Sequence, residues 1–412
     1  MYRAMTSTPS RSSFDVLIIG GGPVGGLLAV VLAGIDLTVA VVEAASPEIL
    51  GRSGSDARAI AVAYTAQKVM AAAGAWESMV PEAGSILEIR VTDAASPLYL
   101  HYDHHELGDD PLGWIIPNPA IRRAVLARLQ QAASARLFAP AKVARLERLN
   151  GRVEAELNDG TRLTAALVVA ADGRASPTRE GAGIGVTRRD YHQNSIVCTI
   201  GHEFPHDGIA HERFLPAGPF AILPLAGNRS GIVWTERPDL AAAICDRDDD
   251  GFLAELKTRI GDFLGEVRLE GPRFHHPLSL QYAQKIVDHR LALIGDAAHG
   301  MHPIAGQGMN MGIRDVAALA EVIVDAARLG LDIGGPRVLE RYQRWRRFDT
   351  MLMLGLTDGL DRLFSNDVAV LKHGRRLGLA AVERLPTAKR FFMRHAMGLV
   401  GDLPRLLRGK AL

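Results

Sequence analysis

The chain has 412 residues, of which 48% are hydrophobic and 23% are charged, the composition of a water-soluble globular protein. Because this length exceeds that of an ordinary domain, we expect two closely packed domains or one domain with a large insertion. A net charge of +1 argues against a nucleic-acid binder, whose phosphate contacts need a clear basic excess.

Cysteine usage and the lengths of apolar runs bear on the compartment. Two cysteines are too few for a disulfide framework and fit a reducing compartment. No apolar run reaches the length of a membrane span, and residues 1–13 lack the apolar core of a secretory signal. Their Ser, Thr and Arg content is similar to the start of a mitochondrial targeting segment, but their shortness favours a disordered leader on a cytoplasmic protein.

The regular structure is expected to begin with a strand, a glycine-rich turn and a helix. Residues 14–19, FDVLII, are typical of a strand buried on both faces, and residues 27–34 have helical composition. In the Gly-x-Gly-x-x-Gly pattern between them, Gly20 permits the tight turn, Gly22 lets a pyrophosphate approach and Gly25 lets the helix pack on the strand. The helix N-terminus then offers unpaired N–H groups to phosphates.

A second strand is expected over Thr38–Val42. It ends at Glu43, where an acid accepts hydrogen bonds from ribose hydroxyls in dinucleotide-binding folds. Residues 51–61 are then predicted to form a polar loop that leads into a helix over Tyr64–Ala73.

Two arginines are candidate cofactor contacts. Arg58 follows Asp56 at the exit of the polar loop, where a helix N-terminal acid beside a solvated arginine is an equally good interpretation. Arg122 lies in the first turn of an expected helix that is entered through Pro119. Because a cation opposes the helix dipole there, we expect either a phosphate or a neighbouring acid to compensate it.

The middle of the chain is predicted to be mostly β-structure. A hairpin over Ser85–Tyr102 is expected to leave the nucleotide-binding domain, and strand patterns fill Gly185–Gln284, with a helix near Gly251–Leu264. Between them lie predicted strands that end at Asp172 and Gly173, where open α/β sheets bind ligands; the strands cover residues 138–149, 152–157 and 162–170.

A histidine-rich segment precedes the expected Arg122 helix. His101, Asp103, His104 and His105 match no tight metal-ligand spacing, so a polar surface turn is the favoured interpretation and no metal is predicted.

The segment LALIGDAAHGMHPIAGQGMNMGIRD, residues 291–315, organises the remainder. A buried strand is expected over Leu291–Ile294 and a helix over Met311–Val324, with Asp296 at the strand tip. The glycines between them leave room for close approach of a ligand, which we interpret as a flavin ring. Beyond Gly335 the chain is expected to be helical, and it is basic there, with sixteen Lys and Arg against seven Asp and Glu.

The predicted fold class is therefore α/β: an FAD-binding Rossmann-like, three-layer domain interrupted by a mixed β-sheet substrate domain, with a helical C-terminal segment. The expected boundaries place the FAD-binding domain at 14–84, 106–185 and 285–335, a substrate-domain hairpin at 85–105, the substrate domain at 186–284 and the helical segment at 336–412.

With these residues assembled, the chain resembles the single-component flavoprotein aromatic hydroxylases of the para-hydroxybenzoate hydroxylase type. GGGPVGG with Glu43, ADGRASPTR and LIGDAAHGMHPIAGQGMNMGIRD are similar to the three fingerprints of that family. GSDARAIAVAYTAQKVM, FAILPLAGNRSGIVWTE and PTAKRFFMRHAMGLVGDLPRLLRG more narrowly resemble the ubiquinone-biosynthesis hydroxylases. The resemblance covers nearly the whole chain from Phe14 onward.

The resemblance implies an oxidoreductase that binds FAD and uses NAD(P)H and O2 as co-substrates. It implies hydroxylation of a polyprenylated phenol through a flavin C4a-hydroperoxide, within or beside a ubiquinone-biosynthesis protein complex. A hydroxylase of a small soluble phenol is the first alternative, and a non-catalytic flavin-fold scaffold or prenyl carrier is the second. A homo-oligomer is compatible with the sequence.

The resemblance also implies site residues. Pyrophosphate is expected at the glycine turn, ribose at Glu43, adenine at the Val143 backbone, ribitol at Asp296 and the flavin pyrimidine edge at residues 306–310, where helix N-terminal N–H groups stabilise the charge of reduced flavin. The full cofactor-binding set is Gly20, Gly22, Pro23, Val24, Gly25, Glu43, Arg58, Arg122, Val143, Asp172, Gly173, Asp296, Gly306, Gly308, Met309 and Asn310.

The candidate catalytic residues are His302, Pro303 and Gly306. His299 and His302 are candidates for proton transfer, and a role in orienting the loop is the stronger interpretation of both.

The C-terminal stretch combines aromatic and basic residues. Phe391, Phe392 and Met393 interleave with Lys389 and Arg390, the pattern of an amphipathic basic helix. We expect either a contact with another domain or subunit, or peripheral attachment to anionic lipid on the cytoplasmic side of the inner membrane.

Overall fold

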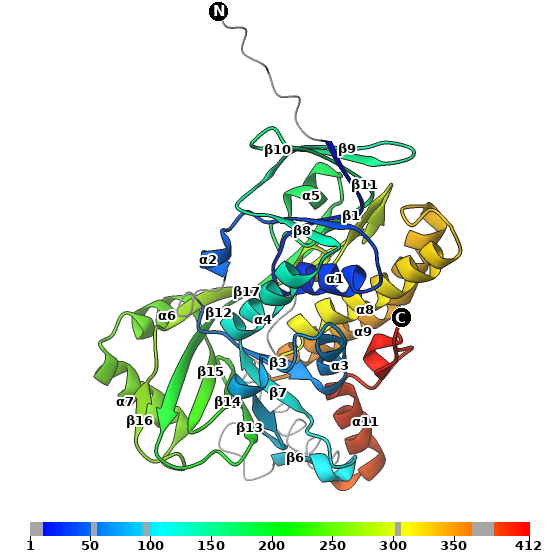
Figure 1. Cartoon of the computed structure of the whole chain (residues 1–412). Coiled ribbons are helices and arrows are strands. Elements are labelled where there is room, and N and C mark those ends of the chain that lie inside the picture. Colours follow the sequence, from blue (N-terminus) through cyan, green and yellow to red (C-terminus); the bar gives the residue numbers. More distant parts are fainter. Residues whose placement is uncertain (1–10, 51–55, 94–98, 301–305, 365–382) are drawn as a thin grey trace, which may run out of the picture.

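Three sheets organise the part of the chain that the structure describes. The structure is a computed structural model, and it describes residues 11–50, 56–93, 99–300, 306–364 and 383–412. An eight-stranded sheet, a nine-stranded sheet and a three-stranded sheet are connected by helices and loops (Figure 1). The α/β fold class is thereby confirmed.

The eight-stranded sheet is parallel through its centre, in the order β18-β19-β11-β1-β2-β8, with a β9–β10 ribbon paired antiparallel to β11. Residues alternate in β1, so that Val16 and Ile18 enter one apolar cluster and Leu17 and Ile19 enter another. The central strands are therefore buried on both faces, as their continuous apolar runs require. The strands are β1 (Arg11–Ile19), β2 (Val39–Val42), β8 (Ala135–Phe138), β9 (Val143–Arg148), β10 (Val153–Leu157), β11 (Arg162–Ala170), β18 (Val287–Asp288) and β19 (Leu291–Leu293).

Helices cover one face of this sheet, and the β9–β10 ribbon covers much of the other, which gives three layers (Figure 1). The helix layer contains α1 (Pro23–Ala33), α3 (Tyr64–Ala72), α4 (Asn118–Gln131), α8 (Gly308–Arg328) and α9 (Pro336–Phe364). Helix α8 is buried on almost every side through its length, so it is a core element of the domain.

The nine-stranded sheet is mostly antiparallel, in the order β20-β17-β12-β15-β14-β13-β5-β6, with β16 on β12. Helices α6 (Pro238–Cys245) and α7 (Asp249–Ile260) pack on one face through Ile196, Phe220 and Trp234. We call the opposite face the inner face. The strands are β5 (Glu88–Asp93), β6 (Tyr99–Asp103), β12 (Val186–His202), β13 (Ile209–Leu215), β14 (Gly218–Leu225), β15 (Arg229–Glu236), β16 (Val267–Leu269), β17 (Phe274–Ala283) and β20 (His299–Gly300).

The three-stranded sheet lies between the inner face and helix α8. A Cβ on Gly231 of β15 would lie 2.4 Å from the Ala59 Cβ, and a Cβ on Gly306 would lie 2.6 Å from the Ala61 Cβ. Both alanines belong to β3 and are two residues apart, so their side chains share one face of the strand. That face therefore contacts both the large sheet and the approach to α8. The strands are β3 (Ala59–Ala63), β4 (Gly84–Ile86) and β7 (Gly113–Pro117).

Several predicted elements need correction. Residues 59–61 belong to β3 and do not form a loop, because Ala59–Ala63 pairs with β7. The predicted strand over 138–149 is two strands, β8 and β9, separated by a cis Ala139–Pro140 peptide. Helix α6 was not predicted. The domain boundaries given above stay a prediction.

Short helices and the C-terminal segment complete the described chain. Met393 of helix α11 (Pro386–Ala396) and Met397, which follows this helix, belong to an apolar cluster that we call the inner-face cluster. Its other buried members are Ile86, Leu100, Tyr102, Leu112, Ile115, Ala210, Phe214 and Leu225. Leu406 and Leu407 are buried in the helix layer. In the part of the chain that the structure describes, no helix combines the length and apolar composition needed to cross a bilayer. The short helices are α2 (Pro47–Leu50), α5 (Pro177–Gly181), η1 (Val80–Glu82), η2 (His104–Glu106), η3 (Gly295–Ala297) and η5 (Leu406–Arg408).

Candidate functional site

The parallel strands bring their carboxyl ends to one edge of the eight-stranded sheet. Gly20 follows β1, Glu43 follows β2, Asp172 follows β11 and Asp296 lies just beyond β19. The four positions are far apart in the sequence, yet their strands are neighbours in the sheet. Ligands bind at such an edge in open α/β sheets, so this edge is the candidate site.

The glycine turn between β1 and α1 has the geometry that its spacing predicts. Gly20 has a φ of +106°, and a Cβ on Gly25 would lie 2.0 Å from the Gly20 carbonyl oxygen. Side chains are therefore excluded at both positions. A Cβ on Gly22 would meet open space, so the backbone at the start of α1 is accessible to a ligand.

Glu43 lies beside this turn. Its carboxylate accepts hydrogen bonds from the Gly21 N–H at 2.7 Å and the Ala45 N–H at 2.8 Å. The remaining lone pairs of the carboxylate are available to hydroxyl donors. The Ala141 N–H donates to the Glu43 carbonyl, which brings Val143, two residues further on, to the same end of the sheet.

Asp56, Arg58, Asn118 and Arg122 form one cluster. Asp56 accepts from the Arg58 Nη2 at 2.6 Å and the Asn118 Nδ2 at 2.6 Å, and it lies 3.5 Å from the Arg122 Nη2. Burial alone would raise the pKa of Asp56, but the arginine hydrogen bond and charge outweigh it and hold the pKa at about 2. Asp56 is therefore the neighbouring acid that compensates Arg122, and it precedes β3 instead of capping a helix. The buried Arg122 Nε has no hydrogen-bond partner among the described residues.

The turn after β19 presents Asp296. The side chain of Asp296 is exposed. Asp56 is the main cause of the raised pKa of Arg58, and the charge of Asp296 adds to it. Asp296 and Arg58 therefore face the same region. Gly295 has a φ of +58° and packs on Val24, because a Cβ there would lie 3.3 Å from the Val24 Cγ1. Val24 also fills the space over Gly312, so it connects the glycine turn to the β19 turn.

A buried ionic network, which sequence reasoning missed, holds the β19 turn. Asp315 is fully buried and accepts from the Gly295 N–H at 2.9 Å, the His299 Nε2 at 2.6 Å and the Arg346 Nε at 2.7 Å. Burial by itself raises the pKa of Asp315. The charges and hydrogen bonds of His299 and Arg346 together lower this pKa by more than burial raises it, so the net shift is downward. The available signal was the adjacent charged pair Arg314 and Asp315 in a stretch of α8 that is otherwise apolar. These contacts support an orienting role for His299.

The N-terminus of α8 faces the same edge of the site. Gly306 has a φ of +61°, and a Cβ on Gly308 would meet open space. The Asn310 side chain is committed to β3, since its Oδ1 accepts from the Ala63 N–H at 2.9 Å and its Nδ2 donates to the Ala61 carbonyl at 3.0 Å. Backbone N–H groups of Gly308, Met309 and Asn310 are thus what this turn offers a ligand.

Asp172 makes hydrogen bonds to the start of helix α5, whose N-cap is Ser176. Its carboxylate accepts from the Ser176 hydroxyl and, at 3.0 Å, from the Thr178 N–H. Its expected role at the cofactor stays a prediction. Gly173, with a φ of +83°, stays open to solvent. Arg179 was not predicted: it is buried and donates at 3.1 Å to the Ala297 carbonyl, next to Asp296.

The donor set fits a flavin dinucleotide. The open backbone at Gly22, at the N-terminus of α1, suits a pyrophosphate, and the open backbone at Gly308, at the N-terminus of α8, suits the oxygens of the ring edge. The exposed carboxylate of Asp296 suits ribitol hydroxyls, and the unpartnered Arg122 Nε is a donor for an oxygen of the cofactor. Pro23 occupies an early position of α1, where it leaves no N–H unsatisfied. The candidate catalytic residues His302 and Pro303 lie outside the described residues.

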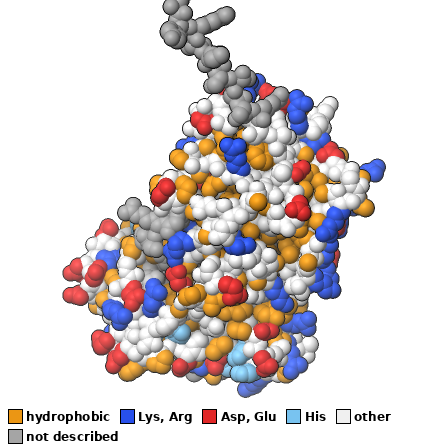
Figure 2. Space-filling view, viewed as in Figure 1, with side chains coloured by type: hydrophobic (Ala, Val, Ile, Leu, Met, Phe, Trp, Pro, Cys, Tyr) orange, Lys and Arg blue, Asp and Glu red, His pale blue; other side chains and the backbone are white. Residues whose placement is uncertain are grey.

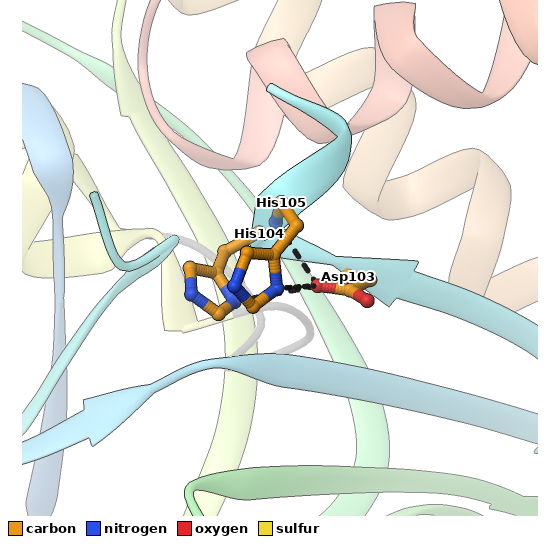
Figure 3. Close-up of side chains that lie close together, drawn as sticks. All are labelled: Asp103, His104 and His105. Atoms are coloured by element: carbon orange, nitrogen blue, oxygen red, sulfur yellow. Dashed lines mark hydrogen bonds and ion pairs between the residues drawn. The ribbon is translucent and has the colours of Figure 1, made fainter. Parts of the chain in front are cut away.

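The histidine-rich turn follows β6, which is the last strand of the nine-stranded sheet. Figure 3 shows its three side chains close together. Ligand atoms of Asp103, His104 and His105 lie within 4.8 Å of one another. Internal contacts already account for the turn: Asp103 caps η2 through the His105 N–H, and the His104 Nδ1 lies 3.0 Å from the Leu87 carbonyl. His101 pairs with Glu88 instead. The absence of a metal stays a prediction.

Comparison with known proteins identifies relatives over nearly the whole length. Residues 13–351 match the family model described as FAD binding domain. The chain is 52% identical to the ubiquinone hydroxylase UbiL of Rhodospirillum rubrum over 97% of this chain and 93% of that protein. It is 33% identical to the 3-demethoxyubiquinol 3-hydroxylase of Escherichia coli over 96% of this chain and all of that protein. The fold is similar to p-nitrophenol 4-monooxygenase PnpA of Pseudomonas putida, with a TM-score of 0.79, 18% identity and coverage of 95% and 99% of the two chains.

Proposed function

Because the chain belongs to the FAD-dependent ubiquinone-biosynthesis hydroxylases, we propose that its substrate is a polyprenylated phenol whose aromatic ring it hydroxylates. The enzyme class is that of an FAD-dependent monooxygenase with NAD(P)H and O2 as co-substrates. The observation that carries the substrate assignment is the 52% identity to a ubiquinone hydroxylase across 97% of this chain.

The cofactor is proposed to bind along the carboxyl edge of the eight-stranded sheet. Gly20, Gly22 and Gly25 with α1 would hold the pyrophosphate, Glu43 and the Val143 backbone the adenosine, and Asp296 the ribitol. The Arg122 Nε is an unused donor for a phosphate or hydroxyl oxygen. FAD supplies the redox chemistry and the activation of O2, and the protein supplies position and electrostatics.

The residues around the flavin ring have separate tasks in this proposal. The N–H groups at the start of α8 stabilise negative charge at the pyrimidine edge. Asn310 connects β3 to that helix through two hydrogen bonds, and so joins the strand that borders the substrate region to the cofactor edge. Asp315 fixes the turn that presents Asp296.

Access of an apolar substrate is proposed to involve the C-terminal segment. Phe391 and Phe392 of α11 are 50% and 40% exposed, while Lys389 on the buried side is neutralised by Glu106 and Glu383. Figure 2 shows Lys and Arg side chains along the right-hand edge, where Figure 1 places the C-terminal helices. Exposed aromatics beside basic groups suit peripheral contact with anionic lipid on the cytoplasmic face of the membrane.

A deletion strain tests the substrate class. Metabolite analysis should show accumulation of a polyprenylated precursor that lacks one ring hydroxyl, and expression of the chain should remove it. Purified holoenzyme should convert that precursor with consumption of NAD(P)H and O2. Unaltered ubiquinone precursors, together with turnover of a small phenol in vitro, would instead favour a soluble aromatic substrate.

A further inference from the structure

The inner face of the nine-stranded sheet carries a carboxyl group, Glu212 of β13, that the cofactor site does not use. The residues on either side of it point outward: the Arg213 Nη1 donates to the Arg259 carbonyl of α7, and the His211 ring lies 4.9 Å from the Phe263 ring. Ala210 and Phe214, two positions away, lie in the inner-face cluster. By strand alternation, Glu212 points to the inner face.

The surroundings of Glu212 are apolar. Val91 on β5 and Ala221 on β14 are its cross-strand neighbours. No hydrogen bond or ion pair to Glu212 occurs among the described residues, and burial raises its pKa to about 7. Part of its surface nevertheless stays accessible. A carboxyl that is surrounded by protein, without a partner and still reachable is typical of a group that lines a ligand site.

Other ionisable groups on the inner face, or packed over it, do not contribute to the pKa shift of Glu212. Burial is the only cause of the Glu212 shift, so none of them acts as its partner. They include Tyr64, Asp93, Tyr102, Arg229, His276 and Lys389, with Asp56 and Arg58 near His276, and Glu106 and Glu383 beside Lys389.

Two hydroxyls on the same face also lack partners. Ser195 of β12 and Thr235 of β15 are directly paired across their strands, and both hydroxyl oxygens are buried without a hydrogen bond among the described residues. Each such group costs about 1–3 kcal/mol unless a ligand or water satisfies it. By the strand register, Thr235 lies two strands from Glu212 and two residues further along, and Ser195 lies one strand beyond Thr235. The inner face therefore carries unpartnered polar groups at separate points of an apolar surface.

The inner face also adjoins the proposed flavin edge. Gly231 on this face meets Ala59 of β3, and Ala61 of the same strand meets Gly306 at the approach to α8. A ring held on the inner face beside β3 would therefore lie next to the ring end of the cofactor site.

Building on the proposed function, we propose that Glu212 is a catalytic residue whose carboxylate accepts the proton of the substrate's phenolic hydroxyl. As the ring carbon forms its bond to an oxygen atom derived from O2, the phenolic O–H bond breaks, its electron pair forms the C=O of a cyclohexadienone and its proton moves to Glu212. The second oxygen atom leaves as water, with two electrons and one hydrogen from NAD(P)H and one proton from solvent. Rearomatisation releases the ring C–H proton to solvent and returns the Glu212 proton to the substrate oxygen.

Glu212→Gln tests this assignment, because Gln keeps the shape of the side chain but cannot accept a proton. In single-turnover experiments on holoenzyme, hydroxylation by the wild type should rise with pH through about 7. In the variant it should fall by about 100-fold or more and lose this pH dependence. FAD content should be unchanged. The matched control is Glu266→Gln, whose side chain is 86% exposed. Glu212→Gln protein with the wild-type rate and pH profile would overturn the proposal.

An infrared titration of the holoenzyme separates this proposal from the substrate assignment. The protonated carboxyl band of Glu212 should disappear with a midpoint near pH 7, be absent from Glu212→Gln and shift on addition of phenol. If the wild type hydroxylates only a small soluble phenol, but through Glu212, the polyprenyl assignment fails and the catalytic assignment stands. A Glu212 band that phenol leaves unchanged refutes the catalytic assignment, even if polyprenylated phenol is the substrate.

Discussion

Removal of the Asp315 carboxylate should destabilise the protein and release its flavin. Asp315→Ala removes the acceptor for the Gly295 N–H and the partner of His299 and Arg346, and all of these contacts are buried. In the Asp315→Ala variant, Arg346 would keep its ion pair with Asp349. The His299 ring would lose Asp315, the one partner that the described structure shows for it. Breaking a buried ion pair from one side costs about 3–5 kcal/mol, which is a large part of the total stability of a typical protein.

Thermal unfolding followed by circular dichroism and by the fluorescence of released flavin measures this effect. For a chain of 412 residues, about 3–5 kcal/mol corresponds to a fall of both transitions by about 3–6 °C. We expect flavin to be released first, because Gly295 positions the Asp296 turn. Asp262→Ala is the matched control, since its side chain is 92% exposed and its pair with Lys257 spans 3.8 Å. Asp315→Ala protein that melts with the control and retains its flavin would refute the argument.

Three further changes test other parts of the site. Asp296→Ala should fold normally but purify depleted in FAD, and full flavin occupancy would contradict the ribitol assignment. Glu212 has a folded-state pKa of about 7 against an ordinary 4.5, so its contribution to the free energy of unfolding is complete below pH 4.5 and is lost as pH rises through 7. The wild type should lose at most about 3 kcal/mol of unfolding free energy over this range relative to Glu212→Gln. If the urea midpoints of the two proteins change equally between pH 5 and pH 8, this expectation is wrong. Phe391→Ser with Phe392→Ser should weaken sedimentation with anionic phospholipid vesicles, whereas the control Phe204→Ser, 49% exposed in wild type, should not; equal sedimentation of the two would exclude α11 as the lipid contact.

Local patterns predicted the cofactor half of the fold well. The β1 turn, with its fixed glycine spacing, and the strand ends at Glu43 and Asp296 lie where the sequence placed them, because each depends on a few consecutive residues. The predicted hairpin over 85–102 is also present as β5 and β6, although the structure pairs β5 with β13 as well.

Contacts that join distant segments could not be predicted in this way. Residues 59–61 form a strand only because β7 and Asn310 satisfy the β3 backbone. The Asp315 network depends on the packing of α8 against α9, and Glu212 became notable only when strand alternation and its neighbours were known. The local sequence around a buried acid does not show whether the fold will place a cationic side chain beside it, as it does for Asp315 and does not for Glu212 among the described residues.

The position of Val24 also bears on when the cofactor site can exist during synthesis. Val24 is made among the first residues, but the two glycines that it packs against, Gly295 and Gly312, emerge from the ribosome only after most of the chain. The parallel sheet is likewise completed by β19, far along the chain from β1. Because such distant pairings form slowly and late, we expect flavin to be acquired after translation of both halves. Nascent chains arrested before Leu291 should therefore fail to retain FAD, so that bound flavin reports a chain that extends at least through Gly312.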